Sequence, residues 1–295
     1  MNNEIKIVRS SVIGYCMGVK KAVESAINAV KEYPSSKIYT FGQLIHNPAT
    51  LKMLENLNIH AIDEKDLDNG KVKKGDVVII RAHGVCPKII SILEEKKINI
   101  INSTCPRVIR NRKLAERYAE NSLVILAGDK NHPELIGIEG YVLNQKNAKC
   151  VIVQNAEEAS KLENLESNQP IALIPQTTIK EEEFILISNI LKKKIKNLLI
   201  FNTICPATTE RQEALKSLFT NVEAILIVGG KNSANTKRLF NTATTSGLPS
   251  FLLENEKDIP EEIRFFDKIG IASGASTPDE VIEEIEKALK KIKKS

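Results

Sequence analysis

The sequence contains no tryptophan, and aromatic residues make up only 4% of its 295 positions. Proteins that bind single-stranded nucleic acid commonly stack the bases on aromatic side chains, so a platform of that kind is not expected. The net charge of +5 is modest, and the excess lysines lie in the helix-like stretches 190–197 and 285–295, where they indicate solvated helix faces. We therefore expect no nucleic-acid partner, whereas the mild positive balance suits a small anionic substrate.

Long apolar runs are also absent. No stretch approaches the roughly 20 residues that cross a bilayer, and the first ten residues, MNNEIKIVRS, lack the apolar core of a signal peptide. The five cysteines are scattered and odd in number, which does not fit a disulfide framework. These features predict a cytoplasmic protein with no membrane partner, whose cysteines serve as core residues, metal ligands or nucleophiles.

Several short motifs are missing as well. The Cys-x-x-Cys spacing of zinc ribbons and ferredoxins does not occur, which excludes a metal site that is built from one local loop. Neither a Walker loop nor G-x-G-x-x-G is present, so no nucleotide is indicated. With 42% hydrophobic and 27% charged residues, the composition is that of a globular protein long enough for two or three domains.

Three of the cysteines lie in similar sequence settings. Cys105 and Cys205 occur in INSTCPRVIRNRKL (101–114) and FNTICPATTERQEAL (201–215), where an apolar strand-like run precedes Cys-Pro and a helix-like stretch. Cys16 lies in a looser copy, IKIVRSSVIGYCMGVKKAV (5–23), with Met-Gly in place of proline. Three cysteines at equivalent strand-to-helix turns predict one site that is built by three copies of a unit.

Each copy continues in the same order. The helix after each cysteine leads to a strand and a polar loop, and the loop residues His46, His132 and Ser233 follow their cysteines by 30, 27 and 28 residues. Two further strands follow, and the second ends in another polar loop. In the first, second and third copy, that second loop contains His83, Thr177 and Ser276 respectively. We place the units at 16–104, 105–204 and 205–295, and expect the N-terminal strand within 1–15 to complete the third sheet.

The strands are continuously apolar and alternate with helices, which predicts parallel sheets covered on both faces. Ligands of such sheets bind at the carboxyl ends of the strands, and every polar loop residue above follows a strand. The predicted fold is therefore α/β, with three similar small domains, each a parallel sheet flanked by helices, arranged as a pseudo-threefold trefoil around a central cleft. Three tandem units without a shared site are the alternative, which would leave the polar loops without a function.

The cysteines are expected to sit at helix N-caps, because Pro106 and Pro206 suit the first helical position. There the helix dipole favours a thiolate. Cys16, Cys105 and Cys205 would then hold three irons of a [4Fe–4S] cluster and leave the fourth iron open to a substrate oxygen. Zinc or plain packing of the thiols is the alternative, although structural zinc usually takes four protein ligands.

Three further residues of these types have no equivalent in the other copies. Cys150 begins a strand and is expected to be a buried core residue. Cys86 lies three residues after His83, near the predicted cleft, and is expected to be a bystander thiol and not a ligand. His60 lies in the middle of a strand, where a structural role is expected.

The loops carry hydrogen-bond donors suited to an anion. Three of the four histidines, His46, His83 and His132, lie in the repeat-equivalent loops. The hydroxyl and amide side chains beside them are those of Thr177, Thr178, Ser233, Asn235 and Ser276. Neutral or cationic donors at helix N-termini suit phosphate oxygens. Because no nucleotide motif accompanies them, a diphosphate ester without a base fits best.

Glu134 is the only carboxylate inside these loop motifs. Beside His132 and Thr177 in a closed cleft, desolvation would raise its pKa toward neutrality and make it a proton donor. The alternative is a role in capping, or in the dipole chemistry, at the start of the following helix.

The motifs together resemble the 4-hydroxy-3-methylbut-2-enyl diphosphate reductase family, whose members catalyse the last step of the methylerythritol phosphate route to isoprenoids. The resemblance extends essentially from end to end of the chain. It rests on nine motifs in order: YCMGVKKAV (15–23), HN (46–47), AHGV (82–85), TCPRV (104–108), HPE (132–134), QTT (176–178), ICPATTERQEA (204–214), GGKNSANTKRL (229–239) and SGASTPD (273–279).

The resemblance implies a trefoil of three α/β domains around a [4Fe–4S] cluster with three cysteine ligands and one open iron. It implies reductive removal of the substrate hydroxyl to give isopentenyl and dimethylallyl diphosphate, with electrons from a ferredoxin- or flavodoxin-type donor. Glu134 would deliver the proton, and Thr177 and Thr178 would orient the hydroxyl; His132, beside Glu134, would be the third catalytic residue. The implied diphosphate ligands are His46, His83, His132, Ser233, Asn235 and Ser276.

Two departures from the family and two other function classes stay open. Ala234 stands where many members carry a second serine, so one diphosphate contact is expected to be lost, and GDKN (128–131) lacks the histidine of some relatives. A non-catalytic Fe–S electron carrier or diphosphate-binding module, or a dehydrating enzyme similar to quinolinate synthase, is the alternative. An electron carrier needs no acid beside an open iron, so Glu134 favours the reductase. No long exposed apolar stripe is predicted, so we expect a monomer.

Overall fold

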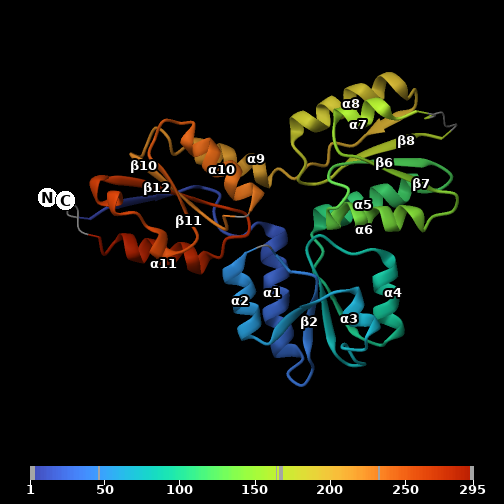
Figure 1. Ribbon diagram of the computed structural model, residues 1–295, viewed down its shortest axis with the longest axis horizontal. Helices are drawn as coiled ribbons and strands as arrows, with labels where there is room; N and C mark the ends of the chain where they lie inside the picture. The colour runs from blue at the N-terminus through green and yellow to red at the C-terminus, as the bar shows by residue number, and fades with distance from the viewer. Residues whose placement is uncertain (1–3, 46, 164, 166–168, 232, 293–295) are drawn as a thin grey trace. The chain divides into compact units, whose positions relative to one another are not determined.

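Three parallel sheets form the framework of the chain. The structure, a computed structural model, describes residues 4–45, 47–163, 165, 169–231 and 233–292. Each sheet has four strands, all neighbouring strands are parallel, and the spatial order is equivalent in all three: β3-β2-β4-β5, β7-β6-β8-β9 and β11-β10-β12-β1. Helices connect the strands (Figure 1). The predicted α/β class, with three parallel sheets flanked by helices, is confirmed.

The strands are short, with three to six residues each. The first sheet contains β2 (Ile38–Phe41), β3 (Ile59–Ile62), β4 (Val77–Ile80) and β5 (Asn99–Asn102). The second contains β6 (Leu123–Ala127), β7 (Lys149–Val153), β8 (Ile171–Pro175) and β9 (Leu198–Ile200). The third contains β10 (Ala224–Val228), β11 (Ser250–Leu253), β12 (Lys268–Ser273) and β1 (Lys6–Arg9).

The helices follow the strands in a regular alternation. The α-helices are α1 (Met17–Glu32), α2 (Pro48–Asn56), α3 (Glu64–Asp68), α4 (Pro87–Glu95), α5 (Pro106–Ala119), α6 (Pro133–Leu143), α7 (Ala156–Lys161), α8 (Glu181–Lys194), α9 (Ala207–Lys216), α10 (Ala234–Thr244) and α11 (Asp279–Leu289). Two short 3₁₀ helices, η1 (Glu256–Asp258) and η2 (Glu261–Phe265), lie between β11 and β12. Within the described part of the chain, no helix has both the length and the apolarity that a bilayer crossing requires.

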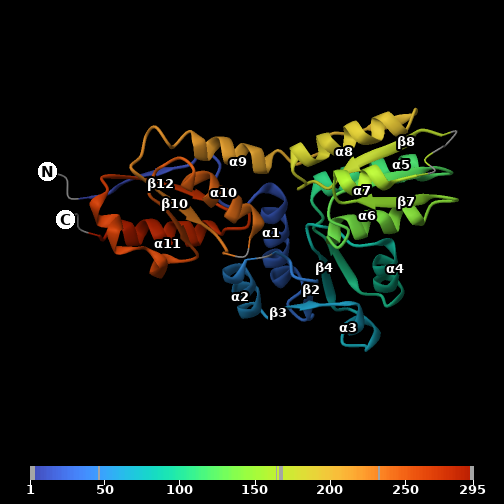
Figure 2. The ribbon, with the colours of Figure 1, turned by 45° about the horizontal axis from the view of Figure 1, so that its top comes forward.

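The N-terminal strand belongs to the same sheet as the C-terminal strands. β1 pairs in parallel with β12, with Lys6 opposite Lys268 and Arg9 opposite Ile271. Figures 1 and 2 show this blue segment beside the orange strands of the third sheet. This is the pairing that the repeat led us to expect, and it places the strand that precedes Cys16 at the same sheet position as β5 and β9, the strands that precede Cys105 and Cys205.

The central strands are buried because both of their faces are covered. In β6, Ile125 and Ala127 face a core that includes Phe184, Ile187 and Leu191 of α8. The alternate residues Val124 and Leu126 face a second core with residues of α5 and α6. Successive side chains of a strand point to opposite faces, so a strand covered on both sides has no polar position. This explains the continuous apolar runs in the sequence.

The fold contains two compact units. Unit 1 comprises residues 1–20, 45–58 and 206–295, and unit 2 comprises residues 21–44 and 59–205. Unit 1 contains the third sheet and α2, and unit 2 contains the first and second sheets.

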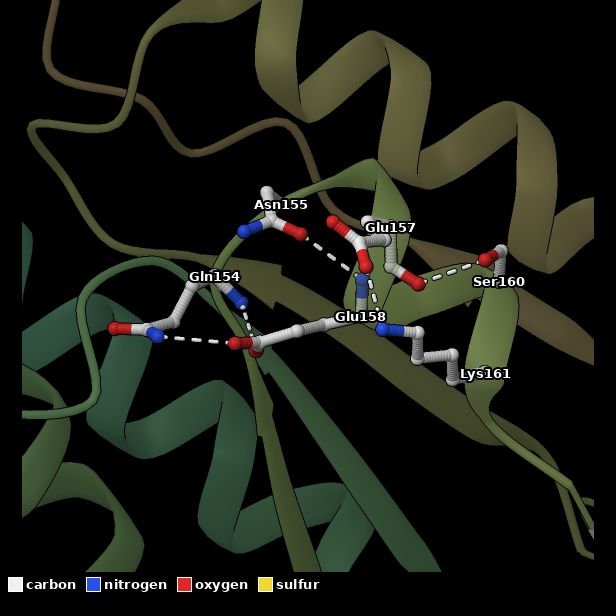
Figure 3. Close-up of polar contacts among 6 residues, drawn as sticks. All are labelled: Gln154, Asn155, Glu157, Glu158, Ser160 and Lys161. Atoms are coloured by element: carbon white, nitrogen blue, oxygen red, sulfur yellow. Dashed lines mark hydrogen bonds and ion pairs between the residues drawn. The ribbon is translucent and has the colours of Figure 1, made fainter.

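A capped turn after β7 braces the loop that leads to His132 (Figure 3). The side-chain oxygen of Asn155 accepts a hydrogen bond from the amide of Glu158 at 2.9 Å, as an N-cap residue does. The Glu158 carboxylate accepts from the backbone and side-chain nitrogens of Gln154, at 2.9 and 3.0 Å. Gln154 in turn accepts from the amide of Lys130 at 3.3 Å. The acidic or amide residues at the end of this strand therefore position the loop before the HPE motif.

Candidate active site

The three repeat cysteines share one backbone contact. The amides of Cys16, Cys105 and Cys205 donate to the carbonyls of Ala275, Ala82 and Thr177, at 2.9, 2.9 and 2.7 Å. Each carbonyl lies in the polar loop after β12, β4 or β8, so each cysteine is fixed directly beside that loop. Matching the carbonyls aligns Thr178 with His83 and Ser276. In the structure the residue equivalent to His83 and Ser276 is therefore Thr178, one residue after the Thr177 that the sequence comparison gave.

The turns around the cysteines differ by one residue. The first helical hydrogen bonds are accepted by the carbonyls of Cys16 and Cys105, which makes these cysteines the residues that start α1 and α5. In the third turn the first acceptor is the carbonyl of Pro206, which is the N-cap of α9. The prediction that Cys205 is an N-cap is therefore wrong. Pro206, with dihedrals of −69° and −13°, takes the N-cap position instead. All five cysteines are free thiols.

Glu134 is the buried acid of unit 2. Its side chain is 1% exposed, and its two carboxylate oxygens accept from the Thr177 amide at 2.8 Å and the Thr177 hydroxyl at 2.6 Å. Burial raises the pKa of Glu134 to about 7, although the two Thr177 hydrogen bonds lower it in part. The N-cap alternative is wrong, because His132 is the N-cap of α6 and the carboxylate contacts the loop after β8 instead. A carboxyl group with a pKa near neutrality can donate a proton at physiological pH.

His132 is oriented by the start of the same helix. Its Nδ1 accepts from the amide of Glu134 at 3.2 Å. In the neutral ring the proton therefore lies on Nε2, which becomes the donor. The ring meets that of His83 edge-on, with centroids 5.1 Å apart. An open pocket of the same unit is lined by His83, Glu134, Asn102 and Thr104. Unit 2 thus brings two predicted histidines, the acid and Thr177 together.

Unit 1 carries the other predicted anion ligands. Ser233 is the N-cap of α10, where its hydroxyl accepts from the amide of Thr236 at 3.3 Å. Asn235 follows in the first turn, and both polar atoms of its side chain are buried without a hydrogen-bond partner within the described residues. Ser276 directly follows Ala275, the carbonyl partner of the Cys16 amide. His46 lies outside the described residues. An unsatisfied amide at a helix N-terminus is the arrangement expected where an anion binds.

Gln176 is a site residue that the sequence analysis did not single out. Its side-chain oxygen accepts from the amide of Asp129 at 3.0 Å, and its nitrogen donates to the Thr178 hydroxyl at 2.8 Å. Gly128, with φ +150°, lies so close that an added Cβ would be 2.5 Å from the Gln176 oxygen. Gln176 therefore links the loop before His132 to the hydroxyl of Thr178. Its place in the QTT motif was the available signal.

Arg211 is a second residue that the sequence analysis missed. It is 2% exposed, and its guanidinium donates to the carbonyls of Gly14 at 2.7 Å and Ser273 at 3.2 Å. Gly14, with φ +75°, also donates its amide to the Ser273 hydroxyl at 2.8 Å. Burial lowers the pKa of Arg211, whereas the nearby Cys16 raises it. A buried cation thus joins the turn before Cys16 to the loop before Ser276.

Replacing Arg211 with methionine is expected to destabilise the protein by about 2–4 kcal/mol, because two charge-assisted hydrogen bonds are lost and two buried carbonyls are left without donors. Urea denaturation measures the change. The control is Lys216→Met on the exposed side of the same helix, for which a change within about 0.5 kcal/mol is expected. Equal effects of the two substitutions would show that Arg211 does not hold this turn.

Cys86, Cys150 and His60 are the residues of these types that the repeat does not include. Cys86 is the N-cap of α4, and its side chain lies close to Gly140, where an added Cβ would be 2.7 Å from the Cys86 Cβ. Cys150 packs against the core beside α5 and α6 but is only partly buried, whereas the sequence predicted a buried core residue. Burial raises the pKa of its thiol to about 12. His60 is exposed on β3, at the edge of the first sheet.

The predicted metal ligands are divided between the two units. Cys105 and Cys205 belong to unit 2, and Cys16 belongs to unit 1. Among the described residues, no group of three or more His, Cys, Asp or Glu side chains is placed to hold a metal ion. The three cysteines therefore stay a predicted ligand set, supported by their equivalent turns and free thiols.

Comparison with known proteins decides the family. The sequence model of a family described as "LytB protein" matches residues 7–290. The chain belongs to the LytB family. Curated relatives of the chain carry the name 4-hydroxy-3-methylbut-2-enyl diphosphate reductase. The one from Treponema denticola is 48% identical over 96% of this chain and 98% of its own length. The one from Treponema pallidum (strain Nichols) is 39% identical over 98% and 84%.

Two solved LytB-like structures resemble the whole chain. One is described as the structure of (E)-4-hydroxy-3-methyl-but-2-enyl diphosphate reductase, the terminal enzyme of the non-mevalonate pathway. It matches with a TM-score of 0.81 and 35% identity, covering 98% of this chain and 100% of that one. The other is the corresponding reductase from Plasmodium falciparum, with a TM-score of 0.77 and 30% identity, covering 96% and 87%.

Proposed function

We propose that this LytB protein reduces 4-hydroxy-3-methylbut-2-enyl diphosphate to isopentenyl and dimethylallyl diphosphate. The reaction replaces the allylic C–O bond with a C–H bond. It takes up two electrons and two protons and releases water. The observation that best supports the proposal is the buried Glu134 carboxyl, held by Thr177 and having a pKa of about 7. The leaving hydroxyl needs a proton, and this group is able to supply one near neutral pH.

Cys16, Cys105 and Cys205 are proposed to hold a [4Fe–4S] cluster with one position free of protein ligands. The residues fit, because free thiols occur at three turns whose backbones are held by the same amide-to-carbonyl contact. Such a cluster, when bound, would supply electrons one at a time and Lewis acidity toward an oxygen. Zinc is less suitable, since it carries no redox chemistry.

Glu134, Thr177 and His132 are proposed as the catalytic groups. Thr177 holds the Glu134 carboxyl through both of its oxygens and would orient the substrate hydroxyl, with Thr178 beside it. His132 would present its Nε2 proton to the substrate, since Nδ1 is occupied by the Glu134 amide. The role of these residues is to hold the hydroxyl and to deliver its proton.

The diphosphate is proposed to bind the donors His46, His83, His132, Ser233, Asn235 and Ser276. The N-terminus of α10 contributes backbone amides and a favourable dipole. The Nδ2 of Asn235, which has no hydrogen-bond partner within the described residues, would donate to a phosphate oxygen.

The remaining parts of the proposal concern organisation and partners. We propose three repeat domains, 16–104, 105–204 and 205–295, because each four-stranded sheet falls within one of them once β1 joins the third. A trefoil around one central cleft would bring the three cysteine turns together. The protein would act in the cytoplasm, where free thiols persist. It would act as a monomer and receive electrons from a ferredoxin- or flavodoxin-type donor.

The test is turnover by protein that is purified without oxygen. We expect a brown protein that, with dithionite-reduced viologen, converts the allylic alcohol diphosphate to the two products, which mass spectrometry identifies. A colourless protein with tightly bound zinc, or a brown protein that accepts electrons without consuming the diphosphate, would contradict the proposal. The second result would favour an electron carrier.

A further inference from the structure

One helix next to a predicted cluster ligand has an unusually basic surface. α5 buries Val108, Asn111, Ala115 and Ala119 on one face. The opposite face carries three exposed cations: Arg110, Lys113 and Arg117. At 3.6 residues per turn, these three positions lie within a sector of about 60°. We call Arg110, Lys113 and Arg117 the α5 basic stripe.

Stability of the helix does not explain Arg110 and Lys113 of the stripe. Like charges three and four residues apart repel each other, as Arg110 and Lys113 do, and Lys113 and Arg117. The only acidic residue of α5, Glu116, forms an ion pair with Arg112, which is not part of the stripe. Across the part of the chain that the structure describes, none of the three stripe cations forms an ion pair.

Another charged helix of unit 2 provides a contrast. α8 has three glutamates in its first turn and three lysines, Lys192, Lys193 and Lys194, in its last turn. That arrangement stabilises a helix through its dipole. α5 lacks acidic residues in its first turn and carries Arg107 there instead, which the dipole disfavours. Arg117 lies in the last turn, where the dipole favours a cation. Arg110 and Lys113 lie between the two ends and are therefore better explained by an external anionic partner than by folding.

The stripe begins close to Cys105. Cys105 is the N-cap of α5, and Arg110 follows it by five residues. With a rise of 1.5 Å per residue, Arg110 lies about 7.5 Å and Lys113 about 12 Å beyond Cys105 along the helix axis. A protein that docks on the stripe is thus held within a few turns of a predicted cluster ligand.

We infer that the α5 basic stripe is the docking surface for the electron donor, a small acidic iron–sulfur or flavin protein. This inference rests on the proposed function, because the proposed reductase must take up two electrons per turnover. Complementary charge accelerates the encounter of two proteins, and added salt screens this attraction. A nucleic acid is the other anionic occupant that the experiment distinguishes.

The experiment compares two electron sources. Arg110→Glu/Lys113→Glu is assayed with a photoreduced plant-type [2Fe–2S] ferredoxin and, separately, with a reduced cationic viologen. We expect kcat/KM for the ferredoxin to fall about tenfold or more, since charge reversal removes the steering, while the viologen-driven rate stays unchanged. Arg110→Gln/Lys113→Gln should show a smaller loss. Lys192→Glu/Lys193→Glu on α8 makes the same charge change and should leave both rates as in the wild type.

The viologen-driven rate also reports whether each variant is folded and active. If the charge-reversed variant does not fold, the wild-type protein supplies the test, because salt should then lower its ferredoxin-driven rate and not its viologen-driven rate. An unchanged ferredoxin-driven rate, an equal loss in the α8 control, or insensitivity to salt would overturn the inference. So would binding of a single-stranded oligonucleotide to the stripe without effect on the ferredoxin-driven rate. Failure of the proposed function differs, since the wild type would then lack viologen-driven turnover.

Discussion

Replacing Glu134 with glutamine is expected to lower the viologen-driven kcat by about 10²–10⁴-fold, while the iron content stays at the wild-type level. Glutamine keeps the size of the side chain and an oxygen for the Thr177 amide, which bonds to Glu134 at 2.8 Å. It has no proton to donate at neutral pH. The measurement is steady-state turnover of the anaerobically purified variant, with iron determined on the same sample.

The pH dependence of the wild type tests the same role. Glu134 has a pKa of about 7 because it is buried, so its acid form predominates below pH 7. We expect the viologen-driven kcat to fall as the pH rises through about 7. A flat profile, or full activity of Glu134→Gln, would show that the proton comes from another group.

Protein stability provides a control, because Glu134→Gln should lower the activity and yet raise the stability above pH 7. The pKa of Glu134 rises from an ordinary 4.5 to about 7 on folding, so the folded protein binds more protons than the unfolded chain between these values. Its contribution to stability is present below pH 4.5 and is lost as the pH rises through 7, by about 3 kcal/mol in total. Above pH 7, Glu134→Gln is therefore expected to be more stable than the wild type in urea denaturation. Low activity is then not a sign of misfolding.

The second large effect is expected for Cys105→Ser, which should lose most of its iron and at least about 10²-fold in activity. Serine is a good N-cap residue, so the start of α5 should be preserved. Its hydroxyl does not replace the soft thiolate that iron–sulfur clusters require. Iron and sulfide analysis, with visible absorption for the cluster, measures the effect in anaerobically purified protein.

Cys86→Ser is the matched control, because Cys86 is also an N-cap with proline at the next position. Its side chain lies close to Gly140 of α6, and we propose no role for it as a ligand. This variant should keep the iron content and activity of the wild type. Equal iron in the Cys105 and Cys86 variants would remove Cys105 from the ligand set.

The fold was accessible from the sequence because its pattern is repeated and strongly apolar. Strands such as β10, which reads AILIV, are buried on both faces, so they appear as uninterrupted hydrophobic runs. The repeat also indicated the position of β1, whose partner β12 lies more than 250 residues away. The start of α9 was predicted one residue too early, since Pro206 has helical dihedrals and yet is the N-cap.

Long-range polar contacts were only partly accessible from the sequence. The repeat placed Glu134 in one cleft with Thr177, 43 residues away, and predicted that burial raises its pKa, which the structure agrees with. Arg211 lies in a helix that reads as polar, and only the structure shows that its guanidinium is buried against Gly14 and Ser273. Gln176 likewise acts through a contact with the Asp129 amide. Such roles depend on which loops lie next to each other in the fold, and the type of a residue does not reveal its neighbours.

The central claim is that Cys16, Cys105 and Cys205 hold one cluster and leave one metal position for the substrate. ⁵⁷Fe Mössbauer spectroscopy of the anaerobically purified wild type tests it most directly. The account predicts about four irons per chain, of which one differs from the other three and changes its signal when the allylic alcohol diphosphate is added. Four irons that all behave alike and ignore the diphosphate, or a protein without iron, would contradict it.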